Sequence, residues 1–494
     1  MANYDPYFPV FSPHHTGTSR NAAYERVSED PSKWSLYEAV NRNRLDVVEK
    51  ILSNPVNFDY QQIAGAFRLT GQRGYVEIGE FILNRTKISV DVHCPDGYTA
   101  LVLASREGHD DMLEMLLRHG ADPSRSIYRT RVSALHWTAV NGHTLCAEML
   151  IKAGASVDAL TLQQRTPLIL ASCYGFLDII KLLLRADQGA SISSADLNGM
   201  TALHMSVKEG YNVCTDYLIS EGANIDAQNV DGYTPLLYAI EHNYEELAYR
   251  IIKAGVNLEL YLFRSKTRAI HMALALERFE ICQYLIDAEC NLEATCDLSQ
   301  TCCGSAILNG NIQPIHIVAT SRNLEMFKSI LEKIDTYNLL TPTCEGHSAL
   351  TLAACYGSNE ILETMLKFLT KESPKIKRNN FLFETSNAVL FASLRGRLTN
   401  VLKILQYCGS NLPTPRISID NNTFFNQSRL TYELFDQLLP DDQTKLRKGK
   451  KKNNNSNKKI LSKLIILDRC GAFTFQCWQL WCYFTIPIKS TARR

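Results

Sequence analysis

The sequence has little cysteine and no secretory leader. Its 494 residues include 15 cysteines scattered through apolar stretches, a density too low for a domain held together by disulfide bonds. The first ten residues lack the basic segment and apolar run that mark a leader peptide. These absences exclude a secreted disulfide protein. They predict reduced thiols and a location in the cytoplasm or the nucleus.

Motifs of nucleotide binding, metal binding and catalysis are also absent. No glycine-rich loop precedes Lys-Ser or Lys-Thr, and neither G-x-G-x-x-G nor H-E-x-x-H occurs, so phosphate and zinc lack their usual ligands. The spacing of Cys290, Cys296, Cys302 and Cys303 fits no zinc finger. We favour buried or loop thiols there over a zinc site or a redox sensor. We therefore predict a non-enzymatic protein with no cofactor, no metal and no small-molecule substrate.

The whole chain has a net charge of only +1. This small value excludes a nucleic-acid binder that depends on positive charge over the whole protein. The balance is uneven, however. Residues 445–494 hold 13 Lys and Arg against one acid, and residues 1–444 hold 39 bases against 50 acids. The acidic body predicts partner proteins with basic surfaces, whose association salt should slow. We expect no nucleic-acid partner.

What the sequence does contain is an internal repeat. Five stretches each open with Thr or Ser, then Ala or Pro, then Leu, at successive steps of 34, 33, 35 and 33 residues; they begin at Thr99, Ser133, Thr166, Thr201 and Thr234. Each stretch continues into an apolar helical pattern and ends at a glycine, namely Gly120, Gly154, Gly189, Gly222 or Gly255. A glycine suits a left-handed helix end because it has no side chain to clash.

This pattern resembles the ankyrin repeat, a turn and two antiparallel helices that recur about every 33 residues. The best copies occupy residues 96–122 and 231–257, and weaker ones extend the array in both directions. We predict an all-α helix-turn-helix solenoid of about eleven repeats over residues 34–412, strongest at 96–257. An insertion is expected around 295–311. The inter-helix glycine is replaced at three positions, where the local geometry stays open: Asn243, Glu277 and Arg322.

The segments outside the array differ in composition. Residues 1–33 are proline-containing with little apolar periodicity and are expected to be disordered. Residues 413–459 read as a linker, and its basic run fits a nuclear-import signal, a spacer or a contact for anionic surfaces. Residues 460–494 are apolar and contain Cys and Trp. They fit a membrane anchor over 470–488, an alternative exon, or a ligase-adaptor box whose first half resembles Ile466–Cys470.

Four histidines share one position in their repeats: His136, His204, His271 and His316. A row of metal ligands would need them to converge on a single ion, but stacked repeats hold the rings apart. We therefore interpret them as structural, with each ring hydrogen-bonding across the turn that starts the first helix.

The resemblance implies a function in protein recognition, since ankyrin-like proteins bind partners through hairpin tips and the exposed side of the first helix. Carried onto this chain, the binding residues are the one before the Thr of each repeat and two before the inter-helix glycine: Tyr98, Arg106, Glu107, Arg165, Cys173, Tyr174, Met200, Lys208, Glu209, Tyr233, Glu241 and His242. We predict a scaffold or adaptor with a concave binding face. The alternatives are the substrate-recognition subunit of a ubiquitin ligase and a membrane-tethered adaptor.

Overall fold

The computed structural model describes residues 34–53, 59–185, 189–297, 310–371, 378–394 and 396–408. The predictions for residues 1–33, 413–459 and 460–494 lie outside the described residues. The chain divides into two compact units, Met1–His242 and Asn243–Arg494, and each is described by itself.

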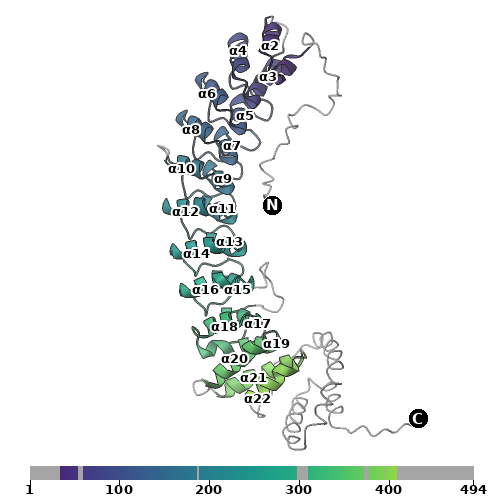
Figure 1. Ribbon diagram of the computed structural model, residues 1–494, viewed down its shortest axis with the longest axis vertical. Helices are drawn as coiled ribbons and strands as arrows, with labels where there is room; N and C mark the ends of the chain where they lie inside the picture. The colour runs from purple at the N-terminus through teal and green to yellow at the C-terminus, as the bar shows by residue number, and fades with distance from the viewer. Residues whose placement is uncertain are drawn as a thin grey trace, which may run out of the picture. The chain divides into compact units, whose positions relative to one another are not determined.

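The first unit is a series of short helices in antiparallel pairs, followed by one further helix (Figure 1). In chain order these are α1 (Leu36–Asn41), α2 (Leu45–Leu52), α3 (Tyr60–Arg73), α4 (Val76–Thr86), α5 (Ala100–Glu107), α6 (Asp110–Arg118), α7 (Ala134–Asn141), α8 (Thr144–Lys152), α9 (Pro167–Tyr174), α10 (Leu177–Arg185), α11 (Ala202–Lys208), α12 (Asn212–Ser220) and α13 (Pro235–Glu241). We call the odd-numbered members first helices and the even-numbered members second helices.

The second unit continues the same alternation of helices. It contains α14 (Glu245–Lys253), α15 (Ala269–Ala275), α16 (Phe279–Asp287), α17 (Pro314–Thr320), α18 (Leu324–Leu331), the 3-10 helix η4 (Thr336–Leu340), α19 (Ala349–Cys355), α20 (Asn359–Lys371), α21 (Arg378–Leu394) and α22 (Leu398–Cys408). The prediction of an all-α fold built from repeated helix pairs is therefore confirmed.

The Thr of each repeat starts a first helix by capping it. The hydroxyl of Thr99 accepts a hydrogen bond from Val102 N–H at 3.2 Å, and the Thr166 and Thr234 hydroxyls do the same at 3.3 Å in their own repeats. The proline that follows Thr166 or Thr234 fits the first helical position because it has no N–H to leave unpaired. These local bonds explain why the motif could be recognised without knowledge of the neighbouring repeats.

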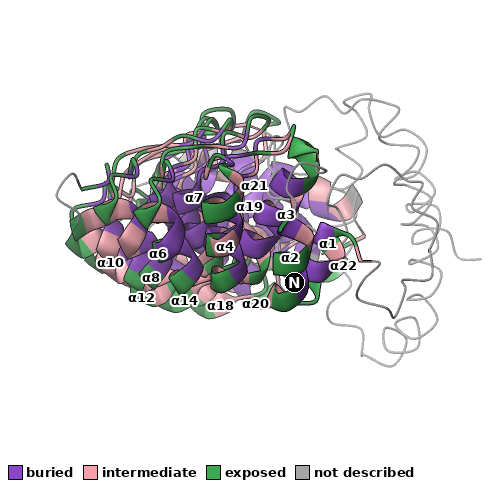
Figure 2. Cartoon of the chain, turned by 90° about the horizontal axis from the view of Figure 1, so that it is seen from above, coloured by how far each residue is buried: buried purple, intermediate pink, exposed green. Residues whose placement is uncertain are grey.

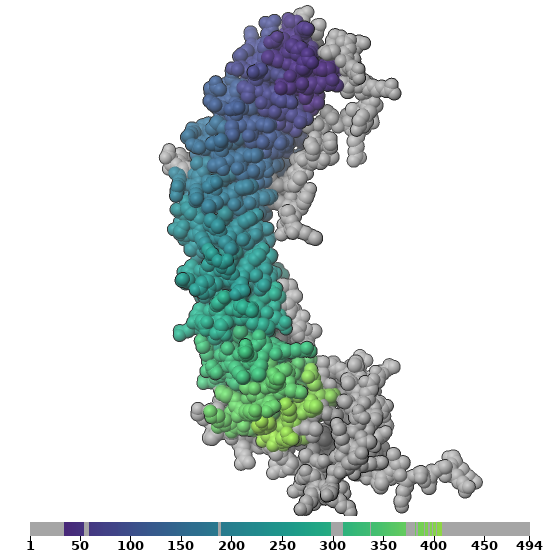
Figure 3. All heavy atoms as spheres, viewed as in Figure 1, coloured from purple at the N-terminus to yellow at the C-terminus, as the bar shows by residue number. Residues whose placement is uncertain are grey.

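The Leu of each repeat builds the core shared by neighbouring pairs. In the first unit it is buried in five successive repeats, as Leu101, Leu135, Leu168, Leu203 and Leu236. First helices pack on first helices, as α7 does on α5 and α9, while α8 packs on α6 and α10. Buried residues accordingly gather between the helices (Figure 2), and the repeats of a unit follow one another as bands of its surface (Figure 3). Each fully buried Leu contributes about 1.5–3 kcal/mol.

Four of the five glycines that end the repeats adopt the expected left-handed backbone. The φ angle is +82° at Gly120 and +90° at Gly154, and Gly222 and Gly255 fall between these values. Two of the positions where another residue replaces the inter-helix glycine are also left-handed, with φ +58° at both Asn243 and Glu277. The third of these positions, Arg322, differs. Its backbone is not left-handed, and the residue before it, Ser321, caps the end of α17 in an extended conformation.

No helix within the described ranges combines the length and apolar character needed to cross a bilayer. The anchor predicted over 470–488 lies outside those ranges, so it stays a prediction.

Candidate functional site

Two successive hairpin turns of the first unit each carry a buried Asp or Asn that shapes the turn. Asp196 Oδ1 accepts hydrogen bonds from Asn198 N–H at 2.9 Å and from Met200 N–H at 3.0 Å. Asn229 Oδ1 does the same for Asp231 N–H and Tyr233 N–H, at 3.0 and 2.8 Å. A short Asp or Asn side chain that bonds its own following backbone is a recurrent way to fix a tight turn.

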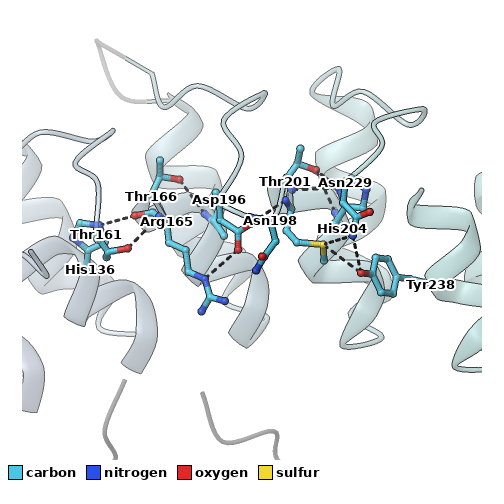
Figure 4. A network of polar contacts seen from close by, with 12 residues as sticks. His136, Thr161, Arg165, Thr166, Asp196, Asn198, Thr201, His204, Asn229 and Tyr238 are labelled. Atoms are coloured by element: carbon cyan, nitrogen blue, oxygen red, sulfur yellow. Dashed lines mark hydrogen bonds and ion pairs between the residues drawn. The ribbon is translucent and has the colours of Figure 1, made fainter. Parts of the chain in front are cut away.

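An ion pair joins two adjacent hairpin turns. Arg165 Nε lies 3.4 Å from Asp196 Oδ2, and the side chains are 16% and 1% exposed respectively (Figure 4). Because the carboxylate is almost wholly withdrawn from water, its three bonds compensate for lost hydration. The predicted binding residue Arg165 is thus held in one orientation by the next repeat.

Asp196 lends itself to a direct test. Replacing Asp196 with Ala removes the acceptor of two turn N–H groups and the partner of Arg165, and we expect the free energy of unfolding to fall by about 2–4 kcal/mol. Asp196→Asn keeps the Oδ1 acceptor, as Asn229 does in the following turn, so its loss should be clearly smaller. Urea unfolding followed by far-UV circular dichroism measures both, and equal losses would contradict the turn-shaping role.

The four repeated histidines connect each first helix to the following turn. His136 Nδ1 accepts from Ser133 N–H at 3.1 Å, across the start of α7, and Nε2 lies 3.1 Å from the Arg165 carbonyl (Figure 4). His204 bonds in the same way to Thr201 N–H and to the Tyr233 carbonyl. A backbone N–H can only donate and a carbonyl can only accept, so each ring is neutral with its proton on Nε2.

The remaining two histidines repeat this geometry in the second unit. His271 Nε2 donates to the Ala294 carbonyl at 3.0 Å, and His316 Nε2 to the Thr341 carbonyl at 2.9 Å. Burial lowers the pKa of His136 and of His271 to about 4, and it also lowers the pKa of His204 and His316. The structural interpretation of these histidines is confirmed by their bonds.

An aromatic cluster lies where the last turn of the first unit meets α13. The Tyr233 and Tyr238 rings stack with centroids 4.8 Å apart, and Lys208 Nζ of α11 lies 6.0 Å from the Tyr238 ring centre. The Tyr238 hydroxyl accepts from Asn229 Nδ2 at 3.2 Å and donates to Met200 Sδ at 3.4 Å. Burial is the main reason why the pKa of Tyr238 is raised to about 12. The neutral hydroxyl therefore acts as a structural link between turn and helix.

Arg106 is the centre of a second group of contacts, at the end of α5. Its guanidinium lies 2.7 Å from Glu107 Oε1 and 5.8 Å from the Trp137 ring centre. Its carbonyl accepts from Asn141 Nδ2 at 2.8 Å and from His143 Nε2 at 3.0 Å. The neighbouring repeat thus bonds the main chain of Arg106, while its guanidinium pairs within its own helix.

The predicted binding residues differ in how much surface they present. Glu107 and His242 are exposed, whereas most of the others are half-buried: Tyr98, Arg106, Arg165, Cys173, Tyr174, Lys208, Glu209, Tyr233 and Glu241. Met200 is only 4% exposed, because its sulfur lies against Tyr238 and Asn229. The structure thus places Met200 in the interior, and it brings Lys208 and Tyr233 together around Tyr238.

Several residues of this region were not singled out by the sequence pattern. Asp196 and Asn229 could have been found, because each stands three residues before the turn glycine, a spacing typical of Asx turns. Tyr238 and Trp137 had no such signal, since each lies within a first helix and its importance comes from the residues of a neighbouring turn or helix.

The cysteine cluster is only partly described. Cys290 is half-buried and Cys296 is buried. Burial raises the pKa of both thiols, that of Cys290 to about 12. Cys302 and Cys303 lie outside the described residues. Within the described ranges, no three His, Cys, Asp or Glu side chains are placed to hold a metal ion together.

Comparison with known proteins extends over most of the helical region. The family model described as ankyrin repeats (3 copies) matches residues 36–127, 124–196, 188–261 and 270–380. These matches lie within the helix pairs described above and together span well over half of the chain.

Similar proteins have different overall functions. The ankyrin repeat and KH domain-containing protein mask-1 of Caenorhabditis elegans is 28% identical over 34% of the chain and 7% of that protein. The human transient receptor potential cation channel subfamily A member 1 is 25% identical over 36% of the chain and 17% of the channel. The E3 ubiquitin-protein ligase XBAT33 of Arabidopsis thaliana is 27% identical over 34% of the chain and 31% of the ligase. The match covers less than a third of each relative.

Proposed function

This chain belongs to the ankyrin repeat family, and from that premise we propose that it is a non-enzymatic scaffold that binds a partner protein along its first-helix face. We use this term for the hairpin turns and the ends of the first helices, the side that the family resemblance makes concave. The family supports a general role in protein–protein interaction.

The observation that carries the proposal is the fixation of predicted binding residues by adjacent repeats. Arg165 is paired with Asp196 of the next repeat, the Arg106 carbonyl accepts from Asn141 of α7, and the Tyr233 carbonyl accepts from His204 of the preceding repeat. A surface that is ordered before binding loses little conformational entropy when a partner arrives. Tyrosine and arginine also provide large contact area together with polar groups, which makes them frequent at interfaces.

We propose that the partner has a basic surface, because residues 1–444 carry an excess of 11 acidic groups. Attraction between opposite charges mainly speeds association and weakens as salt screens it.

Removing three tyrosines of this face tests the proposal. We expect the combined changes Tyr98→Ala, Tyr174→Ala and Tyr233→Ala to weaken partner capture at least tenfold, because aromatic anchors carry much of an interface's binding energy. Proximity labelling and pull-down with the wild-type and variant full-length chains measure this.

The matched control removes three tyrosines from second helices instead, namely Tyr217, Tyr249 and Tyr284. Circular dichroism establishes that both variants keep their helices. The proposal fails if every partner survives the first set of changes, or if the control set removes the same partners.

A ubiquitin-ligase role is the second candidate, and the relative XBAT33, named as an E3 ubiquitin-protein ligase, favours it. In that case residues 460–494 should capture a ligase adaptor, and deleting them should abolish the capture. Retention of the adaptor by the truncated chain would exclude this role for the segment. A membrane-tethered adaptor would instead pellet with membranes and resist carbonate extraction through residues 470–488.

A further inference from the structure

Four successive hairpin turns of the first unit expose a large apolar side chain at the same position. Tyr128, Leu162, Leu197 and Val230 are 59%, 51%, 57% and 60% exposed, and we call these four residues the tip ladder. Their sequence steps of 34, 35 and 33 residues follow the repeat. None of the four belongs to the predicted binding residues. Single exposed apolar residues are ordinary on protein surfaces, but a contiguous row of them is not.

Backbone hydrogen bonds hold the tip ladder in register. The N–H of Tyr128 donates to the Asp96 carbonyl at 3.1 Å. The N–H groups of Leu162, Leu197 and Val230 each donate at 3.0 Å to a carbonyl of the preceding turn, that of Thr130, Gln163 or Asn198. Because every rung is bonded to the turn before it, the four side chains project from a fixed edge rather than from independent loops. This edge of the hairpin turns is largely exposed in Figure 2.

The spacing of the rungs indicates whether a helix or a strand of a partner fits the tip ladder better. Neighbouring first helices pack at interaxial distances of about 8–10 Å, so the rungs recur at about that interval. An α-helix rises about 1.5 Å per residue and brings every seventh side chain to the same face, about 10.5 Å apart. A β-strand presents same-face side chains about every 6.7 Å. At the upper end of this range, the heptad positions of a helix drift from the rungs by only about 1.5 Å over the three steps, whereas same-face positions of a strand drift by about 10 Å.

Charge gives the partner helix a direction. Three exposed arginines surround the Tyr128 end of the ladder: Arg125, Arg129 and Arg131. Arg129 is 84% exposed and its nearest carboxylate oxygen, on Asp96, is 3.5 Å away. An ion pair this exposed is weak, so the Arg129 guanidinium can exchange its present contact for a partner's carboxylate. The turn at the other end carries the exposed acid Asp231.

We propose that the tip ladder binds an amphipathic α-helix of a partner protein, with one apolar side chain every seven residues and carboxylates at the end that meets Arg129 and Arg131. This inference rests on the proposed scaffold function and names the kind of segment that the scaffold recognises. It uses the four tip-ladder residues rather than the tyrosines Tyr98, Tyr174 and Tyr233, so the two proposals can fail separately.

Synthetic peptides of 28 residues test the proposal with the full-length chain. The main probe carries one Leu per heptad on an otherwise polar helix, with three Glu at one end and three Lys at the other. A second probe has the same composition with Leu at every second position over one stretch, a strand pattern. Fluorescence anisotropy measures each dissociation constant. We expect at least tenfold tighter binding of the heptad probe, and equal binding of the two probes would overturn the helical partner.

Protein variants locate the site. We expect Leu162→Asp with Leu197→Asp to weaken binding of the heptad probe at least tenfold. The matched control is Leu145→Asp with Val213→Asp, two positions on second helices that are 61% and 64% exposed, and this should change binding less than twofold. Circular dichroism establishes that both variants stay folded. Equal losses in the two variants would overturn the tip ladder as the site.

A charge reversal tests the direction. A spin label on the Glu end of the probe should broaden the NMR signal of a fluorotyrosine at position 128 more than a label on the Lys end. Arg129→Glu with Arg131→Glu should weaken or reverse that preference, and an unchanged preference would contradict the role of the arginines. Tyr98→Ala with Tyr174→Ala should leave probe binding within twofold. If every scaffold partner survives the loss of the tyrosines while the probe still binds the tip ladder, the scaffold proposal alone is rejected.

Discussion

Acidifying the protein from pH 7 to pH 5 is expected to lower its free energy of unfolding by about 4 kcal/mol through two histidines alone. His136 and His271 have their pKa lowered by burial to about 4, against about 6.5 in an unfolded chain. Between these two pKa values each histidine is protonated in the unfolded state but not in the folded state, so the free energy of unfolding falls as the pH falls. Each histidine contributes about 2 kcal/mol at pH 5 and about 3 kcal/mol by pH 4.

The geometry explains why these rings resist protonation. In His136, Nδ1 accepts from Ser133 N–H while Nε2 donates to the Arg165 carbonyl. A second ring proton would have to sit on Nδ1 and face a donor. His204 and His316 have the same arrangement and a pKa lowered in the same direction, so they add to the loss in this window.

Urea unfolding at half-unit steps between pH 7.5 and 4.5 measures this dependence. The variant His136→Gln with His271→Gln is the control, because Gln at this helical position can still accept from the capping residue's N–H and does not titrate. Near pH 5, unfolding of this variant should take up about two protons fewer than unfolding of the wild type. Its free energy of unfolding should therefore fall less steeply as the pH falls. A wild-type curve that stays flat from pH 7 to pH 5 would show that the buried rings do not govern acid stability.

Replacing Gly142 with Ala is expected to lower the free energy of unfolding by about 2–5 kcal/mol. Gly142 ends α7 with φ +79°, a left-handed conformation that costs other residues about 1–2 kcal/mol. A Cβ atom there would also lie 2.4 Å from Cε1 of Phe176 in the next repeat. Relieving that overlap must displace a ring packed between repeats, and overpacking of this kind adds about 1–3 kcal/mol.

Gly154 provides the matched control, since its φ is +90° but no atom of the described residues lies within 4 Å of the position that a Cβ would occupy. Gly154→Ala should therefore show the backbone cost alone, about 1–2 kcal/mol. Thermal and urea unfolding of both variants measure the difference. Equal destabilisation would mean that the repeat interface tolerates a methyl group beside Phe176.

The repeat architecture could be predicted because its signals are local. Thr166 caps its own helix and Gly154 ends its own repeat, so neither needs a neighbour to be recognised. Whether a side chain at a surface position is exposed or enclosed depends instead on the adjacent repeat. Met200 occupies the same sequence position as Arg165 and Tyr233, but Tyr238 and Asn229 enclose it. The tip ladder was missed for the same reason, since its register is set by bonds between turns.

The histidine bonds have a consequence for how the binding face can vary. Their acceptors are main-chain carbonyls, and the residues that supply them are as different as Arg165, Tyr233, Ala294 and Thr341. Every residue has a main-chain carbonyl, so the hydrogen bond between repeats can form whichever residue type supplies it. The histidine link is thereby independent of the side chain at the turn. A library randomised at position 233 should therefore yield many folded proteins with different partner specificities, whereas position 165 is also constrained by its ion pair with Asp196.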